Sequence, residues 1–133
     1  MNYERIACIS LAITVILGSI GAHAMKPHLT PEAFNSWDTA VKYQIYHSLG
    51  LLILSIAGRV ASVKRNVHQW SMHLIALGLI GFCLSLYLRS SSTVTGLDFA
   101  WLGPVAPVGG LLFIVGWILA AFSFAGIKAG DVN

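Results

Sequence analysis

The feature that most constrains this chain is a run from residue 99 to residue 127 that contains no charged side chain. Three other apolar runs precede it, and 56% of the chain is hydrophobic while only 10% is charged. In a soluble globular domain about a quarter of the residues are charged. The composition therefore predicts an integral membrane protein, in which lipid is the solvent for most of the chain.

The apolar runs predict an all-α membrane protein that is a four-helix transmembrane bundle. A helix rises about 1.5 Å per residue, so roughly 20 apolar residues cross a hydrocarbon layer of ~30 Å. Polar links, and a Gly-Pro break before the last run, separate the four segments. Within a single transmembrane domain, residues 1–133, the predicted spans are residues 6–23, 43–58, 70–88 and 108–125.

A short amphipathic helix is expected before the second span. Thr30 is a good N-cap, Pro31 fits the first helical position, and Glu32 places an acid in the first turn. Apolar residues then recur at steps of three and four up to Val41, which suits a helix at the membrane interface. Residues 90–96, in contrast, have the composition of a loop.

The positive charges of the short loops predict the orientation, because cytoplasmic loops carry more Lys and Arg. Five of these residues lie at the two termini and in the second loop, and three lie in the other two loops. The five are Arg5, Arg59, Lys64, Arg65 and Lys128, and the three are Lys26, Lys42 and Arg89. Both termini are therefore expected in the cytoplasm.

The first apolar run also resembles a secretory signal peptide, since Arg5 precedes it and Ala22-His23-Ala24 fits a cleavage site. Three later spans favour a retained helix instead. The segment is not an Arg-rich, acid-poor leader of the mitochondrial kind, so we expect a multi-pass protein of the bacterial inner (plasma) membrane.

Several classes of chemistry lack a signal in this sequence. The net charge of +3 is scattered over the links, so nucleic acid is not expected as a partner. Cys8 and Cys83 each stand alone in an apolar run, without metal or redox spacing. All five acids fall in loops or tails and no hydrolase motif occurs, so we assign no catalytic residue and no metal ligand set.

Small residues recur at four-residue spacing in the first span, and such ridges let helices approach closely in membranes. They are Ser10, Thr14, Gly18 and Ala22, and Gly81 and Gly116 repeat the theme in the third and fourth spans. The ridges serve packing within the chain, or association with itself or with other membrane protein subunits.

Three motifs resemble those of the transmembrane protein 256 family. They are GAHA at residues 21–24, TAVKYQIYHSL at residues 39–49 and PVGGL at residues 107–111, followed by Gly116-Trp117. The resemblance implies a small four-span protein of bacterial inner membranes or mitochondria. It implies no activity, because the family is a domain of unknown function.

A polar cluster is expected where the first span ends and the second begins. His23 and His47 would lie at similar depth, with Tyr43 and Gln44 one turn from His47, and with His28 and Glu32 in reach from the aqueous side. Ionisable groups inside a bilayer are expensive and mark candidate sites. The cluster could be purely structural, could bind a lipid headgroup or small polar ligand, or could hold haem or a metal at His23 and His47. No cofactor is expected on balance, and His68 and His73 belong at the opposite face.

Small size, small-residue ridges and missing catalytic groups favour an accessory or structural subunit that packs against a larger membrane complex. A small oligomeric transporter or channel is the alternative, in which the Gly and Pro residues before the last span would supply irregular backbone. A cofactor- or lipid-binding protein that uses His23 and His47 is the third hypothesis.

Overall fold

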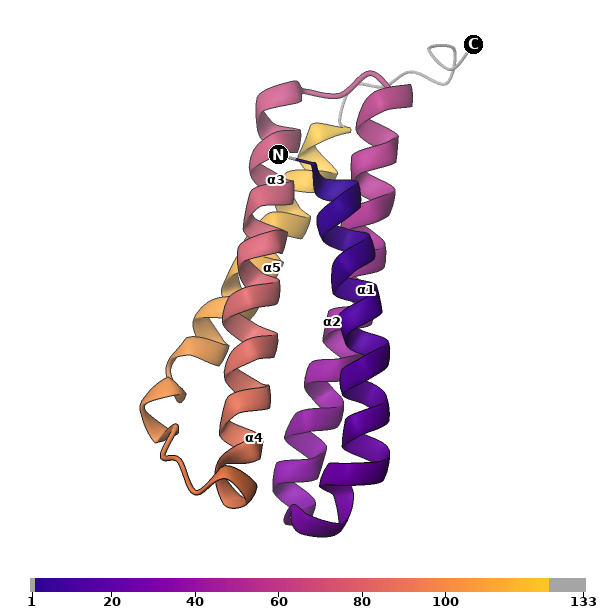
Figure 1. The fold of residues 1–133 in the computed structure, drawn as a ribbon. Coiled ribbons are helices and arrows are strands. Elements are labelled where there is room, and N and C mark those ends of the chain that lie inside the picture. The colour runs from indigo at the N-terminus through magenta and orange to yellow at the C-terminus, as the bar shows by residue number, and fades with distance from the viewer. Residues whose placement is uncertain (1, 125–133) are drawn as a thin grey trace.

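The computed structural model describes residues 2–124, and over that range the chain forms helices and no strand (Figure 1). The helices are α1 (Tyr3–Ile20), η1 (Gly21–Met25), η2 (Lys26–His28), α2 (Pro31–Val60), α3 (Arg65–Gly78), η3 (Leu79–Leu84), α4 (Ser85–Thr95), η4 (Ala100–Leu102) and α5 (Val105–Ser123). The all-helical prediction is confirmed for these residues.

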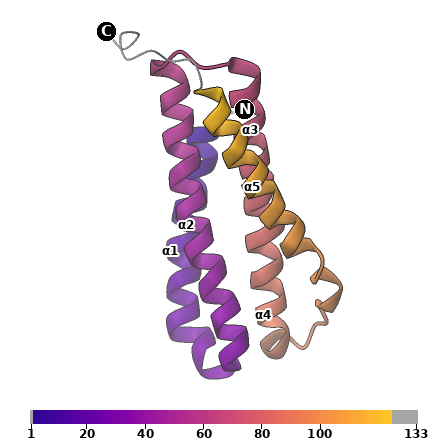
Figure 2. The ribbon, with the colours of Figure 1, turned by 180° about the vertical axis from the view of Figure 1, so that it is seen from behind.

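The helices form an elongated bundle of two pairs. α1 lies antiparallel along α2, and α5 packs along α3 and η3 (Figures 1 and 2). Backbone angles stay helical through η3, so α3, η3 and α4 form one long rod. The N-terminal end of α1 and the C-terminal end of α5 lie at the same end of the bundle, where the Lys64 backbone N–H donates to the Ser123 carbonyl over 3.0 Å.

The helix α2 begins as the sequence predicts. The Thr30 hydroxyl accepts a hydrogen bond from the Ala33 N–H at 3.2 Å, and Pro31 occupies the first helical position. The expected interfacial helix and second span are not separate, however. Because no helix breaker lies between Val41 and Tyr43, the two join into one helix of 30 residues.

The prediction of a loop at residues 90–96 is wrong, because α4 continues to Thr95. The hydroxyl groups there bond to the preceding turn. Ser90 donates to the Leu86 carbonyl at 2.7 Å and Thr95 donates to the Ser91 carbonyl at 3.0 Å, so these side chains need no loop. The helix ends at Gly96, whose φ of 70° suits glycine.

The irregular segment expected before the last span is present as η4, and α5 begins at Val105, slightly earlier than predicted. Pro107 falls in the first turn of α5, where its missing N–H costs no helical bond. The predicted end of this span, residue 125, lies outside the described residues, as does Lys128.

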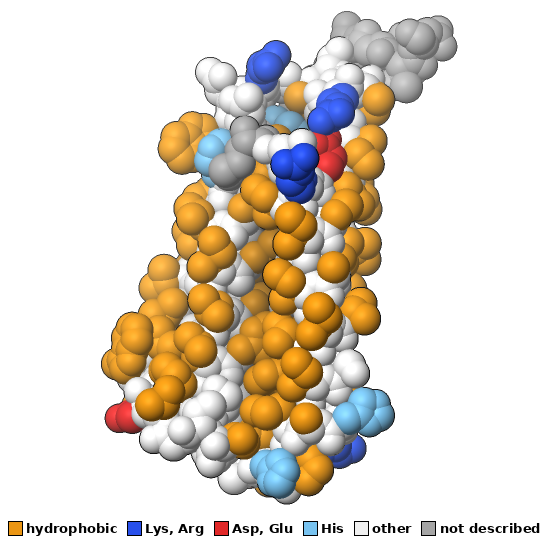
Figure 3. Space-filling view, in the orientation of Figure 1, with side chains coloured by type: hydrophobic (Ala, Val, Ile, Leu, Met, Phe, Trp, Pro, Cys, Tyr) orange, Lys and Arg blue, Asp and Glu red, His pale blue; other side chains and the backbone are white. Residues whose placement is uncertain are grey.

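Three described stretches are long and apolar enough to cross a membrane: Tyr3–His28, Arg65–Thr95 and Ala100–Ser123. α2 is not among them although it has 30 residues. Polar residues such as Gln44 and His47 lower its hydropathy, yet both of these are buried. In the space-filling view a band of apolar side chains covers the middle of the bundle, and Lys and Arg gather at the end that carries the N-terminus (Figure 3).

The small-residue ridge of α1 faces α2 within the chain. Thr14 is 2% exposed, the Ser10 hydroxyl accepts from Ser48, and a Cβ at Gly18 would lie 3.7 Å from Val41. Among these four residues, Ala22 is the exposed one. Gly81 and Gly116 lie in the contact between the other two helices, the α3–η3 rod and α5. A Cβ at Gly81 would lie 3.4 Å from the Gly109 Cα, and one at Gly116 would lie 2.9 Å from Ile75.

Candidate functional site

The structure does not bring His23 and His47 together. His23 is exposed in η1, beyond the end of α1, level with the first turns of α2. The register is fixed by the indole N–H of Trp37, which donates to the Leu17 carbonyl at 3.1 Å. His47 follows Trp37 by ten residues on the same helix, which is ~15 Å along the axis. The two histidines therefore lie at different depths.

His28 and Glu32 are exposed near His23, whereas Tyr43 and His47 stack on each other. The His47 Nδ1 lies 2.8 Å from the Tyr43 carbonyl and donates to it, and its ring lies 3.5 Å, between centroids, from that of Phe113. His47 therefore packs against α5 among aromatic rings. Within residues 2–124, no group of three or more His, Cys, Asp or Glu is placed to hold a metal ion.

Gln44 belongs to a separate polar network between α1, α2 and α4. Its amide oxygen accepts from the Tyr87 hydroxyl at 2.9 Å, and its amide nitrogen donates to the Ser10 carbonyl at 3.1 Å. The Ser48 hydroxyl donates to that of Ser10 at 2.7 Å. Gln44 and Tyr87 are each 7% exposed, so the network hides its polar atoms from lipid.

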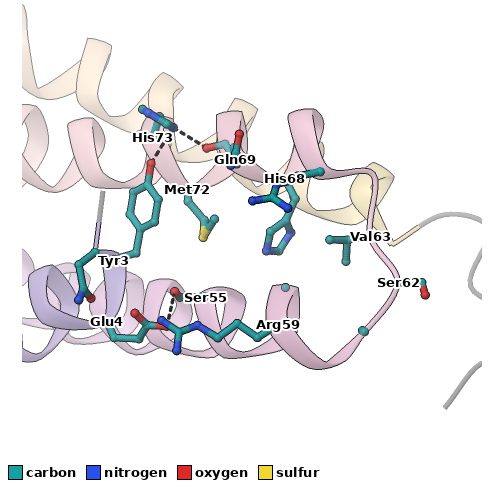
Figure 4. Close-up of a pocket in the computed structure, with 14 residues that line it drawn as sticks. Tyr3, Glu4, Ser55, Arg59, Ser62, Val63, His68, Gln69, Met72 and His73 are labelled. Carbon is teal, nitrogen blue, oxygen red and sulfur yellow. Dashed lines mark hydrogen bonds and ion pairs between the residues drawn. The ribbon is translucent and has the colours of Figure 1, made fainter. Parts of the chain in front are cut away.

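A polar cavity, the end pocket, has a volume of about 1090 Å³ and lies between the start of α1, the end of α2 and the start of α3 (Figure 4). It lies at the end of the bundle where the positive charges gather. Its polar side chains come from these three helices and the α2–α3 link: Asn2, Tyr3, Glu4, Ser55, Arg59, Ser62, Arg65, His68, Gln69 and His73.

One wall of the end pocket is an ion pair between α1 and α2. An Arg59 guanidinium nitrogen lies 2.7 Å from Glu4 Oε1, and the Ser55 hydroxyl donates to the same oxygen at 2.9 Å. The Arg59 side chain is 70% exposed, so the pair is largely solvated and holds little stability by itself. It does keep a guanidinium at the rim of the pocket.

The opposite wall carries two histidines of α3. His68 is 3% exposed, and its ring nitrogens lie 2.9 Å from the Leu54 carbonyl and 3.0 Å from the Ser123 hydroxyl, which ties α2, α3 and α5 together. His73 Nδ1 lies 2.7 Å from the Tyr3 hydroxyl and 2.7 Å from the Gln69 carbonyl. It can accept from Tyr3 or donate to Gln69, according to its tautomer.

An apolar groove of about 600 Å³ continues from this pocket along the bundle. One wall is α1, from Ile6 to Leu17, and the other is formed by α3, η3 and α4, from His73 to Tyr87. Figure 3 shows apolar side chains along both sides of the line where α1 faces α3 and α4. His73 lines both cavities.

Sequence reasoning missed the end pocket because its members lie in three separated segments. Arg59 and Arg65 were identified only as topology signals, and Glu4 only as one of the acids outside the spans. The cationic link with His68 and His73 just beyond it was the available signal. No feature of the sequence around this link indicates that residues 2–4 line the same pocket.

Comparisons with known proteins agree on one family. The model of a family described as "Protein of unknown function (DUF423)" matches residues 17–110. A UPF0382 membrane protein of Staphylococcus haemolyticus is 36% identical over 117 residues, which cover 86% of this chain and 89% of that protein. A UPF0382 membrane protein of Staphylococcus aureus is 34% identical over 124 residues, covering 91% of this chain and 95% of its own length.

No solved structure gives a significant match. The relatives bear out a family of membrane proteins of unknown function, but not the transmembrane protein 256 name that the sequence motifs suggested. The family match covers most of the chain and the relatives span nearly all of it. The chain belongs to the DUF423 family of proteins of unknown function, among which its curated relatives are named UPF0382 membrane proteins.

Proposed function

We propose that this protein is a four-span protein of the bacterial inner membrane whose end pocket binds a phosphate-bearing group at the cytoplasmic surface. One observation carries the proposal. Arg59 and Arg65 both lie on the rim of this pocket, and Glu4 is the single acid among its described lining residues.

α2 would be the fourth crossing. It runs beside α1 for the full length of that helix, from the Trp37 contact at one end to the Glu4–Arg59 pair at the other. Its 30 residues give a length of ~45 Å, enough for a whole bilayer. Its polar residues Gln44, His47 and Ser48 face the bundle, which is how polar groups are tolerated in a span.

The end pocket would face the cytoplasm. Among described residues its end of the bundle carries four cations, Arg5, Arg59, Lys64 and Arg65, against three in the opposite half: Lys26, Lys42 and Arg89. Positive loops stay inside, and the anionic lipids of the inner leaflet attract such clusters. A phosphate group is therefore available at the level of this pocket.

Phosphate suits the chemistry of the walls. Arg presents N–H groups in a planar fork that matches the oxygens of a phosphate, and such charge-assisted bonds are among the stronger ones in proteins. Gln69 and Ser62 add neutral hydrogen-bonding groups to the same lining. With the histidines neutral, the described lining has an excess of one positive charge.

The accessory-subunit hypothesis draws less support from the molecule. The ridges of small residues that motivated it are used within the chain, between α1 and α2 and between α5 and the α3–η3 rod. The transporter hypothesis rested on irregular backbone before the last span. That backbone, η4, lies at the end of the bundle opposite the end pocket.

Binding of a soluble phosphate tests the proposal. Glycerol phosphate would be titrated by calorimetry into the protein held in nanodiscs of zwitterionic lipid. Arg65→Gln removes one charged contact, so we expect about a tenfold loss of affinity or more. Arg5→Gln is the matched control, because Arg5 is exposed at the same end but does not line the pocket. Equal losses in both variants, or no loss in Arg65→Gln, would overturn the proposed site.

A further inference from the structure

We infer that the phosphate held by the end pocket belongs to an anionic phospholipid, one acyl chain of which lies in the apolar groove between α1 and the α3–η3–α4 rod. This inference rests on the proposed function and names the class of ligand for the same site.

The first argument is continuity. The end pocket is polar and the groove is apolar, and His73 lines both, so the two cavities meet at that residue. The contact between Tyr3 and His73, at 2.7 Å, lies at the boundary. A ligand that fills both must therefore have a charged head and an apolar tail joined end to end.

The second argument is depth. The groove follows α1 from Ile6 to Leu17, positions that are eleven helical steps apart, which is ~16 Å along a helix. Half of a hydrocarbon layer of ~30 Å is ~15 Å. A groove that starts at the level of the charged pocket and runs inward by this distance matches the acyl region of one leaflet.

The third argument is the chemistry of the groove walls. Ile9 and Ile13 on α1 and Ile80 and Leu84 on the rod present branched apolar side chains. The polar residues at its base, Gln44 and Tyr87 among them, bond to each other. Among described residues, no buried side-chain nitrogen or oxygen lacks a partner. The groove therefore has no unpaired polar group that a ligand would have to satisfy. A hydrocarbon chain, which cannot form hydrogen bonds, can fill such a groove.

The fourth argument is charge, which distinguishes a specifically bound lipid from the lipids that surround the protein. Many apolar side chains of this bundle are exposed, and any lipid tail can cover them. The groove differs from the rest of this apolar surface in that it meets, at His73, a pocket lined by two arginines. We therefore expect an anionic phospholipid to bind in a one-to-one complex and to be preferred over a zwitterionic one.

Native mass spectrometry in detergent tests this, with dioleoyl phosphatidylglycerol as the probe and dioleoyl phosphatidylcholine for comparison. Ile13→Trp places a bulky ring in the groove, and Ile16→Trp is the matched control. Both residues are exposed on α1, at 43% and 58%, but only Ile13 lines the groove. We expect Ile13→Trp to weaken phosphatidylglycerol binding by about tenfold, with Ile16→Trp close to wild type.

The same variants separate this inference from the proposed function. If Ile13→Trp binds phosphatidylglycerol as well as Ile16→Trp does, while Arg65→Gln still weakens glycerol phosphate, the groove inference fails and the phosphate site stands. If Arg65→Gln changes the binding of neither probe, the proposed function itself fails. If the protein is a dimer in detergent and Ile13→Trp alone makes it monomeric, a second copy fills the groove and the inference is overturned. Melting temperatures of the variants verify that each is folded.

Discussion

The hydroxyl of Tyr3 lies 2.7 Å from Nδ1 of His73, and this contact joins the first turn of α1 to α3 at the point where the end pocket meets the apolar groove. The two rings are also in edge contact, with centroids 5.5 Å apart. Elsewhere along its length α1 packs mainly on α2.

Replacing Tyr3 should weaken the contact between α1 and α3. Tyr3 is 5% exposed, so Tyr3→Phe keeps the ring but removes the hydroxyl contact, at a cost of about 1 kcal/mol. We expect a lower melting temperature in detergent. Tyr46→Phe is the control, because Tyr46 is 63% exposed on α2. Equal melting temperatures for the two variants would show that the contact contributes nothing.

Replacing Glu4 should strengthen anion binding. Glu4→Gln removes the carboxylate that faces Arg59 at 2.7 Å, so the guanidinium can turn to a phosphate and the pocket gains one positive charge. We predict tighter binding of glycerol phosphate, by about threefold to tenfold, in the calorimetric titration. A weaker affinity in a folded variant would show that the carboxylate orders the arginine for binding instead.

The contact between α5 and η3 should tolerate no side chain at Gly109. A Cβ there would overlap the Phe82 backbone nitrogen, whereas one at the neighbouring Gly110 would lie 3.8 Å from the Phe82 ring. Gly109→Ala should cost about 1–3 kcal/mol, and Gly110→Ala much less. Thermal unfolding of the two variants compares them directly. A drop of the same size in both would show that the close contact at Gly109 does not set the effect, since helix propensity alone favours alanine at both positions.

The buried network should behave as one unit. Gln44→Leu leaves the Tyr87 hydroxyl without its acceptor, and Tyr87→Phe leaves the amide oxygen without its donor. Each should destabilise the fold by about 1 kcal/mol, but the double variant should cost less than their sum, because the pair is lost only once. Strictly additive losses in denaturation experiments would mean that the bond carries no coupling energy.

The sequence predicted correctly those features that depend on interactions between neighbouring residues. Thr30 and Pro31 define the start of α2 through a side-chain cap and a fixed backbone angle, and both were predicted. The loop predicted at residues 90–96 was wrong because hydroxyl-rich segments such as that from Ser90 to Thr95 favour loops on average. Here each hydroxyl bonds to its own helix instead.

The predicted pairing of His23 with His47 failed for a geometric reason. It assumed that the second span begins at residue 43, whereas α2 begins at Pro31. The difference of twelve residues is ~18 Å of helix, so the tail of α1 meets the start of α2 and not His47. The end pocket was beyond sequence reasoning, since the Glu4–Arg59 contact joins residues 55 positions apart.

The depth of the pocket and the groove depends on α2 crossing the membrane, and cysteine labelling of its two ends tests this most directly. Asn35 and Asn66 are both exposed, one near the start of α2 and the other just beyond its end. Asn35→Cys and Asn66→Cys would be made singly in a chain whose Cys8 and Cys83 are replaced by alanine.

An impermeant maleimide added to intact cells should label position 35 and should reach position 66 only after the membrane is opened. Labelling of both positions from the same side would show that α2 does not cross. Labelling of position 66 alone in intact cells would invert the orientation and place the arginine pocket outside the cell, and either result would contradict the account.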